Sequence, residues 1–166
     1  MLIQKVIGNK ATLPIKGLVV DPVEFEWFET TKRIQRKRTS SGMDIAIRFL
    51  NEGQVLQQDD VLYFDEQKAV IVNIKPCEAI VVKPGTLLEM GTICYEIGNK
   101  HLPLFIQAGQ VLIPYETPLF RWLQASGYFP VKETRQLINM LKSNIAPHQH
   151  SGPSLFSKII SLAAKQ

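Results

Sequence analysis

The sequence predicts an α+β protein, in which a small all-β domain precedes a ferredoxin-like βαββαβ domain and a flexible C-terminal tail. In the first half, short segments alternate apolar and polar residues between turn residues, as strands do. After Pro76, strand-like and helix-like segments follow in the βαββαβ order. The tail begins near Asn144, and residues 147–153 within it are flexible by composition. We therefore expect domains over residues 1–76 and 77–145, and a tail with a His-x-His pair over 146–166.

The first half is expected to form a small β-sandwich or barrel. Val23–Phe28, Arg33–Arg38 and Asp44–Phe49 read as three strands. Residues 61–64 and 69–74 read as a hairpin. The expected core of this domain comprises Phe25, Trp27, Ile45, Ile47, Leu62, Phe64, Val70 and Val72.

Pro76 is expected to end the last strand of the first domain. Residues 79–82 then read as a short apolar strand. Thr86 is placed to cap a helix that runs to about Lys100, and Glu89 completes a capping box. Three- and four-residue steps are expected to put a set of side chains on one face of this helix, namely Leu87, Met90, Cys94, Ile97 and His101.

The remaining expected elements are strands 104–106 and 111–113, a helix capped by Thr117 and running to about Ser126, a strand over 128–131, and a helical segment over 134–143. Ala108-Gly109 is expected to join the first two strands. Pro118 stands at the first helical position, where proline is favoured.

The composition is that of an ordinary globular protein, with 45% hydrophobic and 20% charged residues. No stretch approaches the roughly 18 to 20 apolar residues that span a bilayer. The N-terminal residues lack a basic region followed by an apolar run, so we expect no signal peptide. The expected location is cytoplasmic, without membrane contact.

Five basic residues crowd the segment 31–38, namely Lys32, Arg33, Arg36, Lys37 and Arg38. Such a cluster can guard a solvated edge strand, bind an acidic protein or bind nucleic acid. Because no aromatic stacking platform or nucleic-acid motif accompanies it, we favour the first two readings and expect no nucleic-acid partner.

The sequence carries no nucleophile elbow, P-loop, dinucleotide fingerprint or H-E-x-x-H motif. Asp59 and Asp60 are adjacent carboxylates, as are Asp65 and Glu66. Neighbouring residues on a strand point to opposite sides, so neither pair is arranged for acid–base catalysis. We therefore expect a protein that is not an enzyme and has no organic cofactor.

Three histidines are the candidate metal ligands: His101, and the pair His148 and His150. Imidazole is the commonest protein ligand for nickel, copper and zinc. One chain offers too few imidazoles for a coordination sphere, but two chains sharing one ion offer enough. Alternatively, His101 favours a helix C-terminus for structural reasons, and the tail pair is merely solvated. Cys77 and Cys94 are expected to be buried thiols, with Cys94 as the less favoured extra ligand.

The segment Gly98–Leu104 resembles the most recognisable motif of the UreE family of urease accessory proteins, which are nickel metallochaperones. The other similar segments are residues 36–49, residues 56–62 with Asp59 where glycine is more usual, residues 76–80 and residues 128–131. The resemblance covers nearly the whole chain before the tail.

The resemblance implies a homodimer in which His101 of both subunits binds one Ni²⁺, with His148 and His150 completing the coordination. Zn²⁺ is expected at the same site. The implied partners are the urease apoprotein activation complex and its GTPase accessory protein. With only two tail histidines, bulk nickel storage is not expected. Tyr115–Thr117 stand where some members carry histidines, so no peripheral site is expected, and Lys100 replaces a common arginine.

Nickel is implied by the resemblance alone, because imidazole sites bind copper more tightly than nickel. Metal binding is expected to weaken below about pH 6, since protonated imidazole is not a ligand. The alternative hypothesis is a metal-independent protein-interaction module that binds an acidic partner.

Overall fold

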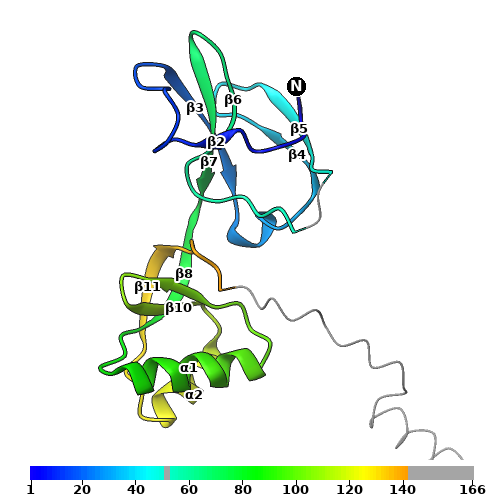
Figure 1. Ribbon diagram of the computed structural model, residues 1–166. Helices are drawn as coiled ribbons and strands as arrows, with labels where there is room; N and C mark the ends of the chain where they lie inside the picture. The colour runs from blue at the N-terminus through cyan, green and yellow to red at the C-terminus, as the bar shows by residue number, and fades with distance from the viewer. Residues whose placement is uncertain (51–52, 142–166) are drawn as a thin grey trace, which may run out of the picture.

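The computed structural model describes residues 1–50 and 53–141. Two lobes lie end to end, joined by a continuous extended segment (Figure 1). In that segment β7 (Lys68–Ile74) belongs to the upper lobe and β8 (Pro76–Val82) to the lower lobe. No helix among the described residues is long and apolar enough to cross a membrane. The upper lobe is all-β and the lower lobe is ferredoxin-like, which confirms the expected α+β class.

The upper lobe is a sandwich of two sheets. One sheet has the order β1-β5-β4, with β1 at Leu2–Ile3, β5 at Asp44–Arg48 and β4 at Ile34–Arg38. The other has the order β2-β6-β7-β3, with β2 at Gly8–Asn9, β6 at Asp60–Phe64 and β3 at Val19–Phe25. The β1–β5 and β3–β7 pairs are parallel and the other pairs are antiparallel.

Most of the expected core of this lobe is buried in one cluster, including Phe25, Ile45, Ile47, Leu62, Val70 and Val72. Phe64 packs instead against a second cluster around Ile15 and Val61. The expected strand over residues 23–28 is too long, because β3 ends at Phe25 and η1 (Trp27–Glu29) follows as a 3-10 helix. The Glu29 carboxylate accepts the Glu26 N–H at 3.0 Å and so closes this turn.

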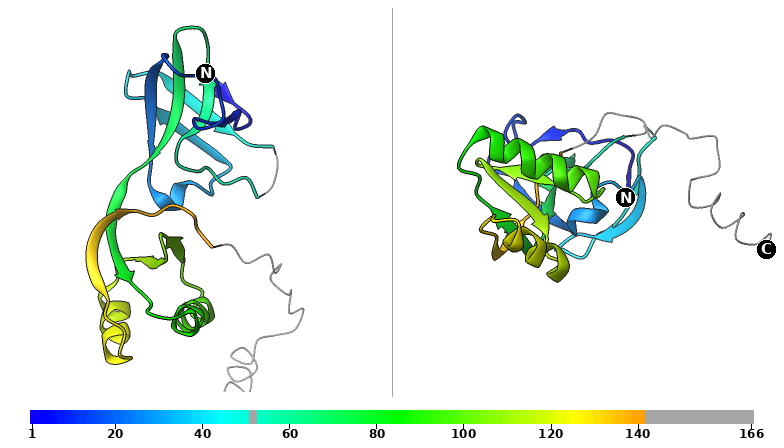
Figure 2. Two further views of the ribbon diagram at one scale, coloured as in Figure 1. Left: turned by 60° about the vertical axis from the view of Figure 1, so that its left-hand side comes forward. Right: turned by 90° about the horizontal axis from the view of Figure 1, so that it is seen from below.

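The lower lobe has the element order β8-α1-β9-β10-α2-β11. Its helices are α1 (Leu87–Asn99) and α2 (Thr117–Ala125), and its other strands are β9 (Phe105–Gln107), β10 (Gln110–Pro114) and β11 (Val131–Gln136). The antiparallel sheet has the order β11-β8-β10-β9, which is the ferredoxin-like arrangement. Both helices lie on one face of this sheet (Figure 2), where Ile93, Ile97, Leu119 and Leu123 pack against its side chains.

Two expectations for the end of the lower lobe are wrong. The last strand begins at Val131 rather than at 128, and it continues to Gln136, so residues 134–136 are not helical. Leu137 is buried, and residues 137–141 form no helix either. Pairing along β8, from Val81 to Pro76, favours extended backbone here. Residues 142–143 of the expected helix lie outside the described residues.

Two turns depend on backbone conformation that favours glycine. Ala108 (φ 49°) and Gly109 (φ 73°) join β9 to β10 as a two-residue hairpin, as expected. Asp59 also adopts the left-handed region, with φ 65°. This φ explains why glycine suits that position, and aspartate tolerates it better than most residues.

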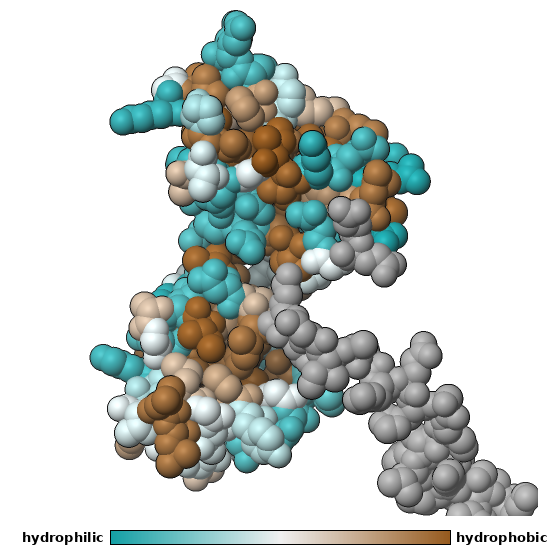
Figure 3. All heavy atoms as spheres, in the orientation of Figure 1, coloured by the Kyte–Doolittle hydropathy of each residue, from teal (hydrophilic) through white to brown (hydrophobic). Residues whose placement is uncertain are grey.

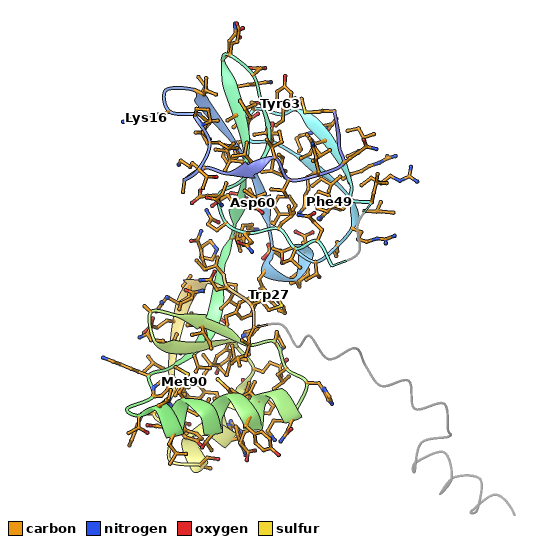
Figure 4. All side chains as sticks on the ribbon, viewed as in Figure 1. Lys16, Trp27, Phe49, Asp60, Tyr63 and Met90 are labelled. Carbon is orange, nitrogen blue, oxygen red and sulfur yellow. The ribbon has the colours of Figure 1, made fainter. Side chains whose placement is uncertain are left out.

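Trp27 lies between the two lobes (Figure 4). Its ring centroid is 5.8 Å from that of Phe105, at an interplanar angle of 84°. The Gln136 side-chain amide also donates to the Ile74 carbonyl at 2.8 Å. The helix-free face of the lower sheet therefore meets the upper lobe, which leaves α1 and α2 on the outer face.

Candidate metal centre

Helix α1 ends in a Schellman motif that places His101 just beyond the helix. The His101 N–H donates to the Gly98 carbonyl at 2.9 Å, and the Leu102 N–H donates to the Ile97 carbonyl at 3.4 Å. His101 occupies the position after the C-cap residue Lys100, with φ 55°. This is the position where glycine is usual, because left-handed backbone is strained for most side chains. Leu102 and Ile97 pack in the same core cluster and anchor the turn.

The periodicity predicted that His101 shares the apolar face of α1, and this prediction is wrong. The helix ends at Asn99, and the left-handed residue turns the chain away from the helix axis. Ile97 is buried in the core, whereas His101 is exposed. Leu87 is also 88% exposed and so lies off the buried stripe. The imidazole is therefore presented to solvent instead of being packed against the sheet.

The start of α1 is fixed by two side chains. Thr86 Oγ1 accepts the Glu89 N–H at 3.1 Å, as the predicted cap requires. Glu89 Oε2 accepts the N–H of Gly85 at 2.8 Å, so the carboxylate reaches one residue further than in the expected capping box. Helix α1 is thus held at both ends.

The start of α2 differs from the expectation by one residue. Thr117 is the first helical residue, and Glu116 precedes it as the cap, without a side-chain hydrogen bond.

Lys100, directly before His101, is held by an aromatic ring. Its ammonium nitrogen lies 4.6 Å from the centroid of the Trp122 ring, within the range of a cation–π contact. Trp122 belongs to α2 and packs at the edge of the lower core. This contact ties the turn that carries His101 to the second helix. The contact requires only the positive charge of Lys100, and not the bidentate guanidinium of the arginine that is common at this position.

Both cysteines are partly buried free thiols. Cys94 lies on α1, partly buried in the lower core, and its Sγ is 3.9 Å from Met90 Sδ. Burial raises the pKa of the Cys94 thiol, and burial followed by the charge of Glu26 raises that of Cys77. Burial therefore disfavours the thiolate, which is the form that a metal binds. This favours the expectation of plain buried thiols.

Within residues 1–50 and 53–141, no three His, Cys, Asp or Glu side chains are grouped closely enough to hold a metal ion. His148 and His150 lie outside the described residues. The described part of one chain therefore presents His101 without further ligands. Completing a site around it takes ligands from the tail or from a second copy of the chain.

The described chain ends close to the turn that carries His101. Phe105 and Met140 form an antiparallel bridge, and the Leu141 N–H donates to the Leu104 carbonyl at 2.8 Å. Leu104 is only three residues beyond His101.

The outward side of α1 carries large apolar side chains. Leu87, Leu88 and Tyr95 are 88%, 81% and 69% exposed. They border a shallow groove floored by Gly91 and Thr92. In Figure 3, hydrophobic side chains gather at the surface over the left end of α1. Monomeric proteins seldom leave such a contiguous apolar stripe uncovered.

Sequence reasoning located His101 and the helix before it but missed the turn. The signal was present: an apolar residue follows at Leu102, a proline follows at 103, and the helical pattern stops at Asn99. These are signs of a helix C-terminus at which the next residue is left-handed. The expected apolar face of α1 also combined residues that the fold separates, because Leu87 is exposed and Ile97 is buried.

Comparison with known proteins gives consistent results along the chain. Residues 3–75 match the UreE urease accessory protein, N-terminal domain, and residues 78–150 match the UreE urease accessory protein, C-terminal domain. The chain is 54% identical over 164 residues to the urease accessory protein UreE of Flavobacterium johnsoniae, covering 98% of this chain and 99% of the relative.

More distant relatives carry the same description. Identity is 43% over 149 residues with UreE of Actinobacillus pleuropneumoniae, covering 87% of this chain and 80% of the relative. It is 38% over 151 residues with UreE of Acetivibrio thermocellus, covering 91% and 98%. These relatives are named accessory proteins and not enzymes, in agreement with the sequence analysis. The chain belongs to the UreE family of urease accessory proteins.

Proposed function

We propose that this chain is a nickel metallochaperone that carries Ni²⁺ to urease during maturation of the urease active site. The observation that carries the proposal is the position of His101. An imidazole stands exposed at a left-handed position that favours glycine, in a family of urease accessory proteins. A strained residue kept where another would be more stable points to a functional demand.

A homodimer supplies the second imidazole. The exposed Leu87, Leu88 and Tyr95 lie on the helix that ends at His101. An isologous contact pairs a surface with its own copy, and we place the two α1 helices side by side in the same direction, so that their apolar sides cover each other and the two turns that follow lie near one axis. Two His101 side chains near that axis would share one ion.

The tail supplies further ligands. His148 is the seventh residue after Leu141. An extended chain covers at most roughly 3.3–3.6 Å per residue, so this stretch reaches up to roughly 25 Å. Leu141 is hydrogen-bonded beside Leu104, three residues from His101. His148 and His150 are therefore within reach of His101 of the same chain, and they complete the sphere as it loads or releases the ion.

Each part of the chain has a separate task in this account. Residues 77–145 hold the ion and dimerise, the tail over 146–166 closes the site, and residues 1–76 contact the maturation machinery, including its GTPase. An exposed site whose ligands come partly from the tail suits transfer, because a closed tetrahedral site would retain its ion. The same imidazoles accept Zn²⁺. Which ion is delivered therefore depends on the partner protein and on the supply of each metal, as well as on the site.

A test of delivery uses a ureolytic bacterium that lacks its own copy of this chain. The cells express the wild-type chain or His101→Asn, and urease activity is measured at limiting and at excess nickel. Asparagine tolerates left-handed backbone, so this variant keeps the turn and loses the imidazole. We expect His101→Asn to lose most urease activity at limiting nickel and to recover it at excess nickel. Wild-type activity of His101→Asn at limiting nickel would contradict the proposal.

A further inference from the structure

The outer face of the β1-β5-β4 sheet carries some positive charge that no other described residue neutralises. Arg38 pairs with Asp44, with Nε–Oδ1 and Nη2–Oδ2 distances of 2.8 Å and 3.1 Å. Lys37 turns inward, where it pairs with Glu29 and lies over the ring of Phe25. Much of the basic cluster predicted from the sequence is therefore already satisfied within the sandwich.

Arg36 and Arg48 are the exceptions. Both are exposed, and neither has an ion pair or hydrogen bond from its side chain to another of the described residues. The strand register places Arg36 opposite Ala46, and Ala46 is two residues before Arg48. Residues two apart on a strand share a face, so the two arginines are diagonal neighbours on the outer face.

Two exposed apolar side chains lie beside these two arginines, on the side away from the Arg38–Asp44 pair. Ile34 lies opposite Arg48, and Leu2 of β1 lies opposite Ala46 on its other side. Ile34 is 67% exposed and Leu2 is 58% exposed. Figure 4 shows nitrogen-tipped side chains projecting into solvent on the side of the upper lobe that carries β4 and β5. The face thus combines two unpaired guanidinium groups with an uncovered apolar surface.

We propose that this face, defined by Leu2, Ile34, Arg36, Ala46 and Arg48, docks an extended acidic segment of a partner protein. Diagonal neighbours on adjacent strands have Cα atoms roughly 7–8 Å apart. Two carboxylates separated by one residue in an extended chain lie about 7 Å apart on one side. The pattern acid-x-acid-x-apolar therefore matches both arginines and brings its apolar residue against the uncovered surface.

A protein segment fits this face better than a nucleic acid does. The apolar side chains here are aliphatic, and the described outer face offers no aromatic ring on which a base would stack. Arginine binds carboxylates in a bidentate geometry, as Arg38 does with Asp44 in the same sheet. The inference is independent of the metal centre, which lies in the other lobe.

The test is an NMR titration of the ¹⁵N-labelled full-length chain with the peptide acetyl-Gly-Glu-Thr-Glu-Thr-Leu-Gly-amide. We expect shifts of amide signals in β4 and β5 and at least tenfold weaker binding of a peptide with glutamine in place of both glutamates. Arg36→Gln and Arg48→Gln should each weaken binding at least threefold. Arg121→Gln, an exposed arginine on α2, should change it less than twofold.

Two results would overturn the proposal. One is the absence of shifts in β4 and β5 up to the solubility limit of the peptide, with the spectrum showing a folded protein. The other is equal or tighter binding of a deoxythymidine hexamer that depends on the same two arginines, which would mark the face as a polyanion site. Neither result bears on nickel binding, so failure here and failure of the metallochaperone proposal are distinguishable.

Discussion

The Leu141 N–H donates a hydrogen bond to the carbonyl oxygen of Leu104, 2.8 Å away. Leu104 is three residues beyond the left-handed His101, so this bond brings the last described residue next to the segment that follows the candidate metal ligand. In the proposed metallochaperone, the tail histidines reach His101 from this pairing at the sheet edge.

Removing the tail imidazoles is expected to weaken nickel binding without abolishing it. The double substitution His148→Ala with His150→Ala should lower the affinity about tenfold, which corresponds to about 1.4 kcal/mol. His101→Ala should lower it much further, because it removes the two imidazoles that the fold holds in place at the proposed dimer axis. Calorimetric titration with Ni²⁺ measures both variants, and equal affinities for the double variant and the wild type would rule out a ligand role for the tail.

Replacing His101 with glycine is expected to separate stability from metal binding. Glycine adopts φ 55° without strain, so His101→Gly should raise the free energy of unfolding by about 0.5–1 kcal/mol while nickel binding is lost. Ala108, with φ 49°, provides the matched control. Ala108→Gly should stabilise by a similar amount and leave nickel affinity unchanged. Urea denaturation measures both, and a clear loss of stability in His101→Gly would show that the imidazole itself holds the turn.

Cys94 is expected to play no part in metal binding. Burial raises the pKa of its thiol, so the thiolate is scarce at neutral pH. Cys94→Ala should therefore leave nickel affinity within about twofold of the wild type, while losing about 1 kcal/mol of stability through lost packing. A large drop in affinity in this variant, with the fold intact by circular dichroism, would place sulfur in the site.

Glu29 is expected to make the upper lobe sensitive to acid. Burial raises the pKa of its carboxyl, but this effect is outweighed by hydrogen bonds from Lys37 and the Glu26 N–H and by the charges of Lys37 and Lys32, so its pKa lies below the usual 4.5. A carboxylate with a lowered folded-state pKa stabilises the fold above its unfolded-state pKa, and this stabilisation is lost as the pH falls through the folded-state pKa.

The measurement is urea denaturation at pH 7 and at about pH 3 for the wild type and Glu29→Gln. The variant should be less stable at pH 7 by about 1 kcal/mol, because it loses the ion pair with Lys37. It should then lose less stability than the wild type on acidification. Parallel loss in both proteins would mean that the charge of Glu29 does not contribute.

Much of the fold follows from local patterns that the sequence displays openly. Alternation predicted β4 and β5, and the Thr86 cap and Ala108-Gly109 turn were predicted where they occur. The predictions were wrong where pairing with a strand distant in the sequence determines the backbone conformation. Residues 134–136 are extended because β8 offers them a partner strand, which no local pattern reveals.

The candidate site was predicted in part. His101 stands out in the sequence because histidine is rare in this chain, but its left-handed backbone arises from the way α1 ends. The exposed side of α1 was predicted only in part, because periodicity groups the exposed Leu87 with Ile97, which the fold buries. Only the folded sheet shows that Ile93 and Ile97 face inward and Leu87, Leu88 and Tyr95 outward.

The most direct test of the central claim is calorimetric titration of Ni²⁺ into the metal-free full-length chain, alongside His101→Asn, with the mass of each protein measured by light scattering. The account predicts about one tight ion per dimer for the wild type. It also predicts loss of that ion in His101→Asn, with the dimer retained through the apolar side of α1. Nickel binding that is unchanged in His101→Asn, or one tight ion bound to each monomer, would contradict a site shared between two copies of His101.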